Sequence, residues 1–289
     1  MDKIEAIVNE LTMMGYTVDV QKVVKNGVEK HGIMIDRQGK SIVATVYAED
    51  FIKNYGDDFH KIAEEMATFV NSARVKDAER EKNKIMQVLS DKNYIKRHIV
   101  IALQRVSTEV ICKKETILNG VEAYLRISFN NFDGMTASVK VTKDILRLSG
   151  IAEDEAWEAA LFNTKNNSEL LTMYDTFKKT IPEELLNGAI EEMQNTYIIR
   201  SILGTHGAAS ICNLDLLHEF AEKMGVDKIV IIPSSIHECI LMAWGDEYSM
   251  EFFSEMVKIV NDTEVVPEDQ LADEAFLIDV NECKSILSE

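Results

Sequence analysis

The sequence predicts an α+β fold built from two parts. Short apolar runs end in tight turns, which favours antiparallel or mixed sheets over a doubly wound parallel sheet. Stretches with helical spacing lie between these runs. A highly charged segment, 73–97, separates an N-terminal part, 1–72, from a C-terminal part, 98–289. With 289 residues, of which 46% are hydrophobic, the chain can bury a substantial core.

The N-terminal part is predicted to be a helix followed by a three-stranded antiparallel meander. Apolar residues recur at helical spacing from Ile4 to Leu11, and Gly15 is placed to end this helix. Asn26-Gly27 between β-branched runs is a strong hairpin signal. A second turn at 37–40 leads into a strand at 41–47.

Helices are predicted to connect this meander to the C-terminal part. Amphipathic helices on either side of Gly56 lead into 73–97, where one apolar stripe among mixed charges predicts a solvated connecting helix. Strands are then predicted at 99–103, 121–127 and 136–141. Helices are predicted at 143–148, 153–162 and 168–177.

The last hundred residues repeat a strand-strand-helix pattern. Residues 197–202 and 208–212 are predicted to form a hairpin around Gly204-Thr205-His206-Gly207, and 228–233 and 238–244 a second hairpin. Helices at 214–224 and 250–260 follow the two hairpins, and the last strand is at 276–280. We expect one larger mixed or antiparallel sheet with helices on one face.

Charge and hydropathy indicate a cytoplasmic protein. The formal charge of −18 argues against direct contact with nucleic acid or an anionic membrane, because both are negatively charged. No apolar run approaches the roughly 18 residues of a membrane helix, and Met1-Asp2-Lys3 opens into an acidic helix rather than a signal peptide. The four cysteines lie far apart without a Cys-x-x-Cys pair, so we expect reduced thiols.

The acidic residues concentrate near the C-terminal end. From 246 to 289 there are thirteen acidic residues against two lysines, a net charge of −11. This surface serves either solubility or the docking of a basic partner protein, or it resembles the phosphates that a nucleic-acid-binding protein recognises. The residues that we expect to bind such a partner are Asp246, Glu247, Glu251, Glu255, Asp269, Asp273 and Glu274.

The segment from Ser234 to Glu238 is the candidate catalytic site. Ser235 and His237 alternate onto one side of a predicted strand and Glu238 onto the other, so a contact between serine and histidine is possible. A hydrolase also needs an exposed nucleophile and a carboxylate that orients the histidine. The sequence contains no Gly-x-Ser-x-Gly elbow, and no carboxylate can be assigned to orient His237. The structural alternative is a turn whose polar side chains hydrogen-bond the backbone.

Metal and phosphate sites are weighed against simpler structural roles. His237, Glu238, Cys239 and His206 carry ligand atoms, but adjacent strand residues face opposite ways, so we expect no metal. Gly204-Thr205-His206-Gly207 offers backbone amides to a phosphate, yet it precedes a predicted strand rather than a helix, and a hairpin turn is favoured. No cofactor is expected.

Three segments carry a family resemblance. They are 204–209 (GTHGAA), 232–238 (IPSSIHE) and 256–267 (MVKIVNDTEVVP), the last followed by Leu271 and Asp273, and Asn163-Thr164 adds a fourth match. In these segments the chain resembles the uncharacterised family called domain of unknown function 5688, from which it departs at Ser201-Ile202 and Ala272. The resemblance implies a protein of gut Gram-positive bacteria, often from mobile-element or phage-derived gene clusters, and it implies no activity.

The function that the sequence favours is therefore non-enzymatic. We expect a protein-binding or regulatory factor of a mobile element, countering a host defence complex, that acts through its acidic surface on a partner with a basic one. Two alternatives remain open. One is a hydrolase-like enzyme centred on Ser235, His237 and Glu238, and the other is a small-ligand sensor at the seam between the two parts.

Overall fold

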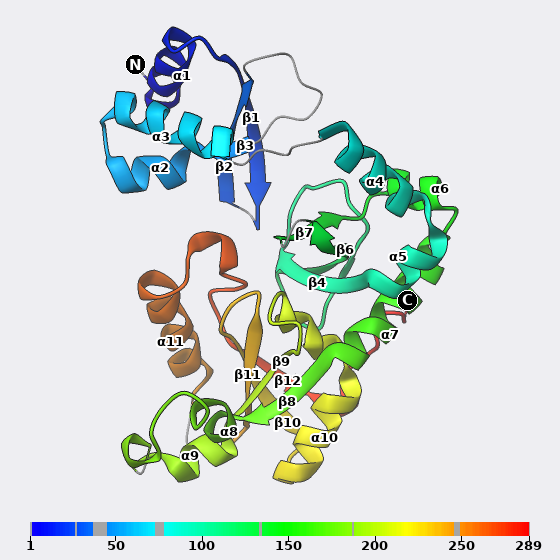
Figure 1. Ribbon diagram of the computed structural model, residues 1–289. Coiled ribbons are helices and arrows are strands. Elements are labelled where there is room, and N and C mark those ends of the chain that lie inside the picture. The colour runs from blue at the N-terminus through cyan, green and yellow to red at the C-terminus, as the bar shows by residue number, and fades with distance from the viewer. Residues whose placement is uncertain are drawn as a thin grey trace. The chain divides into compact units, whose positions relative to one another are not determined.

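The computed structural model contains two compact units. It describes residues 2–26, 28–36, 45–72, 78–132, 135–186, 188–245 and 249–288. One unit comprises Met1–Val88 and the other Leu89–Glu289. Within the described ranges all sheets are antiparallel and helices accompany them, so the predicted α+β class is confirmed (Figure 1). No helix in these ranges combines the length and the apolar character needed to cross a membrane.

The N-terminal unit begins with a helix and a three-stranded antiparallel sheet, as predicted. Its elements are α1 (Lys3–Met13), β1 (Thr17–Lys25), β2 (Val28–Asp36), β3 (Thr45–Tyr47), α2 (Ala48–Tyr55), α3 (Phe59–Ser72) and all but the last two residues of α4 (Ala78–Ser90). The strand order is β1-β2-β3. The predicted turn at 37–40 and the residues 41–44 lie outside the described residues.

Local signals set the ends of these elements. The Asp2 carboxylate accepts a hydrogen bond from the Ile4 N–H and caps α1. Asn26 adopts a positive φ of 47° between β1 and β2, a conformation that asparagine tolerates better than most residues. Helix α1 packs on α3, and both contribute to one buried core that consists mainly of Ile7, Leu11, Tyr16, Ile33, Ile35, Val46, Ile62 and Met66.

The described part of 73–97, which was predicted to be one connecting helix, contains two helices. They are α4 (Ala78–Ser90) and α5 (Lys92–His98). Asp91 lies between them, and its side chain accepts hydrogen bonds from the N–H groups of Asn93 and Tyr94 at 2.9 and 3.1 Å. This side chain is the N-cap of α5, so a new helix begins at Lys92, inside the segment predicted to be one helix.

The strands of the second unit divide into two sheets. The first contains β4 (Ile99–Arg105), β5 (Lys113–Glu115), β6 (Val121–Phe132) and β7 (Met135–Lys140). The long strand β6 is central, because it pairs with β4 on one edge and with β5 and β7 on the other. The sequence did not predict β5, because three residues are too few to show the alternation of apolar and polar residues that indicates a strand.

Helix α7 closes the open edge of this sheet. α6 (Lys143–Ser149) and α7 (Glu153–Asn167) follow β7. Asn163 Nδ2 donates to the Ile99 carbonyl at 2.7 Å, and the Ile101 N–H donates to Thr164 Oγ1 at 3.0 Å. The Asn-Thr pair therefore takes the place of a neighbouring strand, which protects β4 from pairing with another chain.

The second sheet has five strands, which are ordered β12-β10-β11-β9-β8. Their bounds are β8 (Ser168–Thr172), β9 (Tyr197–Ser201), β10 (Lys228–Pro233), β11 (Glu238–Ala243) and β12 (Phe276–Asp279). The helices around them are α8 (Met173–Phe177), α9 (Ile190–Asn195), α10 (Leu214–Met224) and α11 (Met250–Thr263). Short 3-10 helices are η1 (Glu183–Leu185), η2 (Gly207–Cys212), η3 (Pro267–Asp269) and η4 (Val280–Glu282).

Helices cover both faces of this sheet, whereas the sequence suggested one face. Phe220 of α10 packs edge-on against Tyr197 on one face. Phe253 of α11 belongs to a core cluster with Val230 and Ile232 on the other face. Figure 1 shows α10 and α11 on opposite sides of the five strands.

Two predicted elements are wrong. Residues 168–177 were expected to be a helix, but 168–172 form β8, because the edge of β9 is available for pairing. Residues 208–212 were expected to be a strand, but they belong to η2, which is buried throughout. Both edges of β9 are occupied, by β8 and β11, so the predicted hairpin has no edge to use.

Candidate functional site

The segment from Ser234 to His237 forms the turn between β10 and β11. β10 ends at Pro233 and β11 begins at Glu238, so Ser235 and His237 do not alternate along a strand as predicted. Ser235 Oγ accepts a hydrogen bond from the His237 backbone N–H at 3.0 Å. The Ser235 N–H donates to the Glu238 carbonyl at 3.3 Å. The serine therefore stabilises the backbone of the turn.

The imidazole of His237 connects this turn to two other segments. Its Nδ1 accepts a hydrogen bond from the His206 backbone N–H at 3.1 Å, so the neutral ring carries its proton on Nε2. Nε2 lies 3.6 Å from Asp269 Oδ2. The Ile236 N–H also donates to the Asp269 carbonyl at 2.8 Å. Asp269, which we selected from the sequence as a partner-binding residue, is thus the carboxylate beside His237.

This geometry does not pair a nucleophile with a base. Ser235 Oγ receives a backbone N–H, and both nitrogens of His237 face other groups; within the described ranges no hydrogen bond joins the hydroxyl to the ring. Glu238 lies opposite Arg200 in the pairing of β11 with β9, and Arg200 donates to Glu169 at 2.8 Å. Glu238 belongs to this row of charges across three strands rather than to the histidine.

The predicted acidic surface is partly used by contacts within the chain. Asp246 and Glu247 lie outside the described residues. The Asp273 carboxylate accepts hydrogen bonds from both terminal nitrogens of Arg105, at 2.7 and 2.6 Å, and from Asn261 Nδ2 at 3.0 Å. The Arg105 guanidinium lowers the pKa of Asp273. This bidentate pair fixes the segment after η3 to the end of β4.

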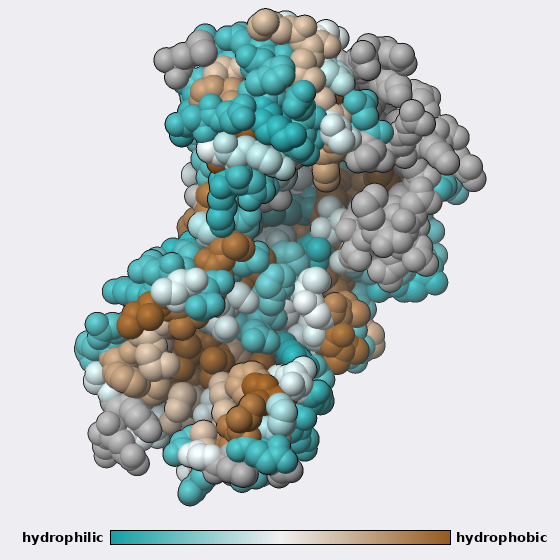
Figure 2. Space-filling model, turned by 60° about the vertical axis from the view of Figure 1, so that its left-hand side comes forward, coloured by the Kyte–Doolittle hydropathy of each residue, from teal (hydrophilic) through white to brown (hydrophobic). Residues whose placement is uncertain are grey.

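The outer surface of α11 carries an apolar row that has acidic neighbours. Phe253 and Val257 face the sheet and are buried. The side of the helix next to this buried side exposes four apolar residues, here called the α11 stripe: Phe252, Met256, Ile259 and Val260. Glu251 and Glu255 are exposed beside this stripe, and Glu274 is exposed in the loop before β12. Figure 2, with the side of α11 turned forward, shows apolar areas bordered by polar residues.

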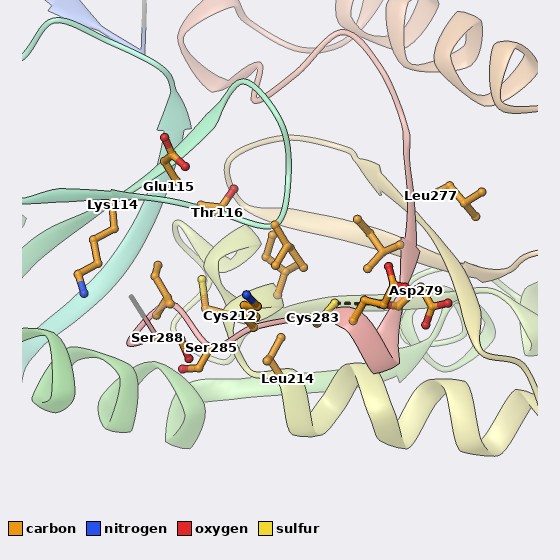
Figure 3. Close-up of a pocket in the computed structure, with 16 residues that line it drawn as sticks. Lys114, Glu115, Thr116, Cys212, Leu214, Leu277, Asp279, Cys283, Ser285 and Ser288 are labelled. Atoms are coloured by element: carbon orange, nitrogen blue, oxygen red, sulfur yellow. Dashed lines mark hydrogen bonds between the residues drawn. The ribbon is translucent and has the colours of Figure 1, made fainter.

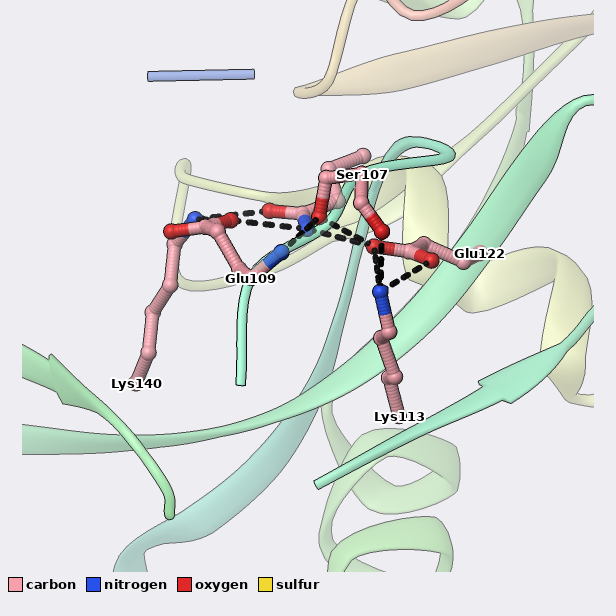
Figure 4. A network of polar contacts seen from close by, with 6 residues as sticks. Ser107, Glu109, Lys113, Glu122 and Lys140 are labelled. Carbon is pink, nitrogen blue, oxygen red and sulfur yellow. Dashed lines mark hydrogen bonds and ion pairs between the residues drawn. The ribbon is translucent and has the colours of Figure 1, made fainter. Parts of the chain in front are cut away.

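A second polar group fills one face of the four-stranded sheet (Figure 4). Its members are Gln104, Ser107, Glu109, Lys113, Glu122 and Lys140. Glu122 is 5% exposed, and it accepts hydrogen bonds from Gln104 and Ser107, both at 2.7 Å. Lys113 pairs with its other oxygen at 3.1 Å. Burial raises the pKa of Glu122, but these hydrogen bonds outweigh it and the net shift is downward.

This network is electrically balanced, because two lysines accompany two glutamates. Lys140 donates to Gln104 Oε1 at 2.7 Å and to Glu109 at 2.6 Å. The network holds the loop before β5 against β4 and β6, so its arrangement is that of a satisfied structural core. Sequence reasoning missed it, although β6 shows the signal: polar residues at every second position, namely Glu122, Tyr124, Arg126 and Ser128.

A cavity of about 700 Å³ lies between the β5 segment, β12 and the residues after η4 (Figure 3). Figure 3 shows Lys114 and Thr116 on one side and Asp279 and Cys283 on another. This volume is typical of small-molecule sites. Cys212 also lines the cavity, and burial raises the pKa of its thiol to about 12, so it is not a thiolate nucleophile at neutral pH.

The candidate metal ligands do not converge. In the described part of the chain no three His, Cys, Asp or Glu side chains are placed to hold one ion. The rings of His206 and His237 lie 5.8 Å apart, and Nδ1 of His237 already accepts a hydrogen bond. Cys239 is buried within β11.

Comparison with known proteins identifies the family. A family model described as a family of unknown function, DUF5688, matches residues 1–279. The chain belongs to DUF5688. This confirms the resemblance seen in the sequence. No curated protein and no solved structure matches the chain.

The DUF5688 motif residues mainly stabilise the fold. Asn163 and Thr164 cover the edge of β4. Asn261 is buried at the end of α11, and its Nδ2 donates to the Ala272 carbonyl at 2.8 Å. Gln270 Nε2 in turn donates to the Asn261 carbonyl at 2.8 Å. Because Ala272 takes part through its backbone carbonyl, the departure from the family at this position leaves the hydrogen bond intact.

Proposed function

We propose that this member of DUF5688 is a non-enzymatic, regulatory protein-binding factor that docks a partner on α11. The α11 stripe carries the proposal. Its four side chains remain 39–57% exposed, although the neighbouring side of the same helix is packed in the core. Apolar side chains that form a row with polar residues at its border are characteristic of interaction surfaces.

The charge beside the stripe defines the chemistry of the partner. Glu251, Glu255 and Asp262 are exposed along α11, and Lys258 is the only basic residue of the helix. The stripe residues recur at intervals of three and four, which suits an amphipathic partner helix with matching apolar positions. Complementarity with the acidic flank favours Lys or Arg beside those positions. The partner is therefore a basic amphipathic segment, which in the setting implied by the family resemblance belongs to a host complex.

The geometry of the predicted catalytic residues supports a role without catalysis. Ser235 stabilises a turn, His237 joins that turn to two neighbouring segments, and Glu238 lies in a strand. Each side chain thus has a role in the fold that requires no substrate.

A defined peptide tests the proposal. Fluorescence anisotropy would measure binding of a labelled amphipathic Leu/Lys helix and, as a charge control, of a Leu/Glu helix. We expect the Leu/Lys peptide to bind better, with an affinity that falls as salt rises. The double variant Phe252→Ser/Ile259→Ser should weaken binding about tenfold or more, because it removes two apolar anchors.

The control variant is Phe162→Ser, which changes an apolar residue of α7 that is 66% exposed. It should bind the peptide like the wild type. Equal binding of both peptides, or wild-type affinity of the Phe252→Ser/Ile259→Ser protein, would refute the proposal. A dimer in sedimentation experiments that the double variant abolishes would assign the stripe to a second copy of the chain instead.

The 700 Å³ cavity supports a second candidate function, the binding of a small ligand. A ligand that binds only the native state raises the melting temperature. We expect a hit from a metabolite panel to stabilise the wild type but not Leu214→Trp, whose larger side chain would fill part of the cavity. A panel without any stabilising compound, or a hit that stabilises both proteins equally, would count against this site.

A further inference from the structure

A small polar cavity of about 30 Å³ lies where the two sheets of the second unit meet. Arg126 and Ser128 of β6 line one side, and Ser201, Thr205 and His206 line another. No aspartate or glutamate is among the described residues that line it, although the chain has 49 acidic residues. Among the described lining residues, the charged side chain is the cation Arg126. Because Thr205 is exposed, the cavity reaches the surface.

Arg126 has no anionic partner within the described ranges. It is half-buried in the face of β6 that also carries Tyr124, and no hydrogen bond or ion pair of its guanidinium is present there. Its neighbour across the strand pair, Lys140, is engaged by Glu109 and Gln104 instead. Burial lowers the pKa of Arg126, and no carboxylate offsets that effect. A desolvated charge without a counter-charge is costly in a folded protein.

His206 also has an unused polar atom. Its Nδ1 is buried and lacks a hydrogen-bond partner in the described part of the chain. The residue adopts a positive φ of 52°, a strained conformation for histidine, and its N–H is fixed by His237 Nδ1. Burial, together with the charge of Arg126, lowers the pKa of His206 to about 3, so the ring is neutral at pH 7. A neutral ring can present an Nδ1–H donor.

We propose that this cavity binds a small oxyanion, the carboxylate or phosphate group of a ligand. Arg126 supplies charge-assisted hydrogen bonds, for which its planar guanidinium is suited. Nδ1–H of His206 and the hydroxyl groups of Ser128 and Ser201 complete the donors. The cavity of about 30 Å³ is too small for a whole metabolite, so it receives oxygen atoms of the anion while the rest of the ligand lies toward Thr205.

Thermal unfolding with inorganic phosphate, acetate and a phosphate monoester, each against chloride at equal ionic strength, tests this site. We expect at least one oxyanion to raise the melting temperature of the wild type. Arg126→Met should weaken the binding of that anion about tenfold or more. Without oxyanions, this variant should have a melting temperature no lower than that of the wild type, because the substitution removes an unpaired charge. Arg97→Met, at an exposed arginine, is the matched control.

The outcomes separate the sources of the anion. A response to inorganic phosphate or acetate alone assigns a free anion, and a response only to the monoester assigns the end of a larger ligand. No oxyanion-specific shift in the wild type, or an equal shift in Arg126→Met, overturns the proposal. If Arg126→Met does not fold, imidazole ¹⁵N spectra of the wild type decide: the anion must shift the Nδ1 resonance of His206, and an unchanged resonance overturns the site.

Discussion

Gly207 is the position where the fold of the candidate site should be most sensitive to one added methyl group. It opens η2, directly after His206. A Cβ atom there would lie 2.5 Å from the His237 carbonyl oxygen and still closer to the Ser201 backbone nitrogen. Both are backbone atoms of other segments, so neither can move aside as a side-chain tip can. We therefore predict that Gly207→Ala destabilises the protein.

The size of the effect follows from these contacts. Ordinary contacts of a Cβ begin at 3.4 Å, so the contact of an alanine methyl group with the oxygen would be roughly 1 Å too short. Overpacking of this kind costs about 1–3 kcal/mol. The usual gain of about 0.4–1 kcal/mol from replacing glycine in the unfolded chain offsets only part of this cost. For a domain of this size each kcal/mol lowers the melting temperature by about 2–4 °C.

The assay is urea unfolding of Gly207→Ala beside Gly245→Ala. Apart from the chain neighbours of Gly245, no described residue has an atom within 4 Å of a Cβ built there, so the control should be neutral or slightly stabilised. Equal midpoints for the two variants would refute the reasoning, because they would show that strand β9 and the turn at His237 do not approach Gly207 this closely.

Three further predictions concern charged and titratable groups. Burial lowers the pKa of His206 to about 3, so between pH 6.5 and 3 the unfolded chain binds a proton that the native protein does not bind. As the pH falls through this range, the wild type should lose stability relative to His206→Asn by up to about 1.4 kcal/mol per pH unit. Parallel plots of unfolding free energy against pH for the two proteins would contradict this. Asp273→Asn should lower the free energy of unfolding in urea at pH 7 by about 1 kcal/mol or less, since the ion pair of Asp273 with Arg105 is partly exposed. This difference in stability between wild type and variant should shrink as the pH falls through the lowered pKa of Asp273, below 3.8. A difference that does not change with pH would be inconsistent with the ion pair. Glu122→Leu should lower the free energy of unfolding by about 2–4 kcal/mol, because it leaves buried hydrogen-bond donors unpaired. Glu115→Gln, at an exposed strand position, should change it by no more than about 0.5 kcal/mol. Similar urea midpoints for the two variants would mean that the polar network around Glu122 is not tightly packed.

The elements that could be predicted from the sequence are those with local signals. The hairpin of β10 and β11 combines two apolar runs with a polar turn, and α1 has regular spacing and a glycine after it. The errors arose where long-range pairing decides. Ser168–Thr172 became a strand because β9 offers an edge, and 208–212 became η2 because that edge was already used.

The sequence predicts which segment forms the candidate site, but not which distant residues contact it. The polar residues around Ser235 could be predicted to support a turn, and they do. The contact of His237 with the His206 N–H joins residues 31 positions apart, and only the packing of η2 against the turn reveals it. The carboxylate that faces His237 comes from η3, which no local pattern links to a histidine.

The sequence of α11 already contains the pattern that produces the α11 stripe. Apolar residues occupy 252 and 253, 256 and 257, and 259 and 260, so both sides of this helix are apolar. A helix on the surface of a sheet needs only one such side. The second side therefore predicts either a further layer of the fold or a partner, and the structure leaves that side exposed.

Hydrogen exchange of the full chain with and without the Leu/Lys peptide tests the central claim most directly. The account predicts slower exchange in α11, residues 250–263, and no such protection in the Phe252→Ser/Ile259→Ser protein or with the Leu/Glu peptide. Protection that appears elsewhere in the chain while α11 exchanges at its original rate would contradict docking on the α11 stripe.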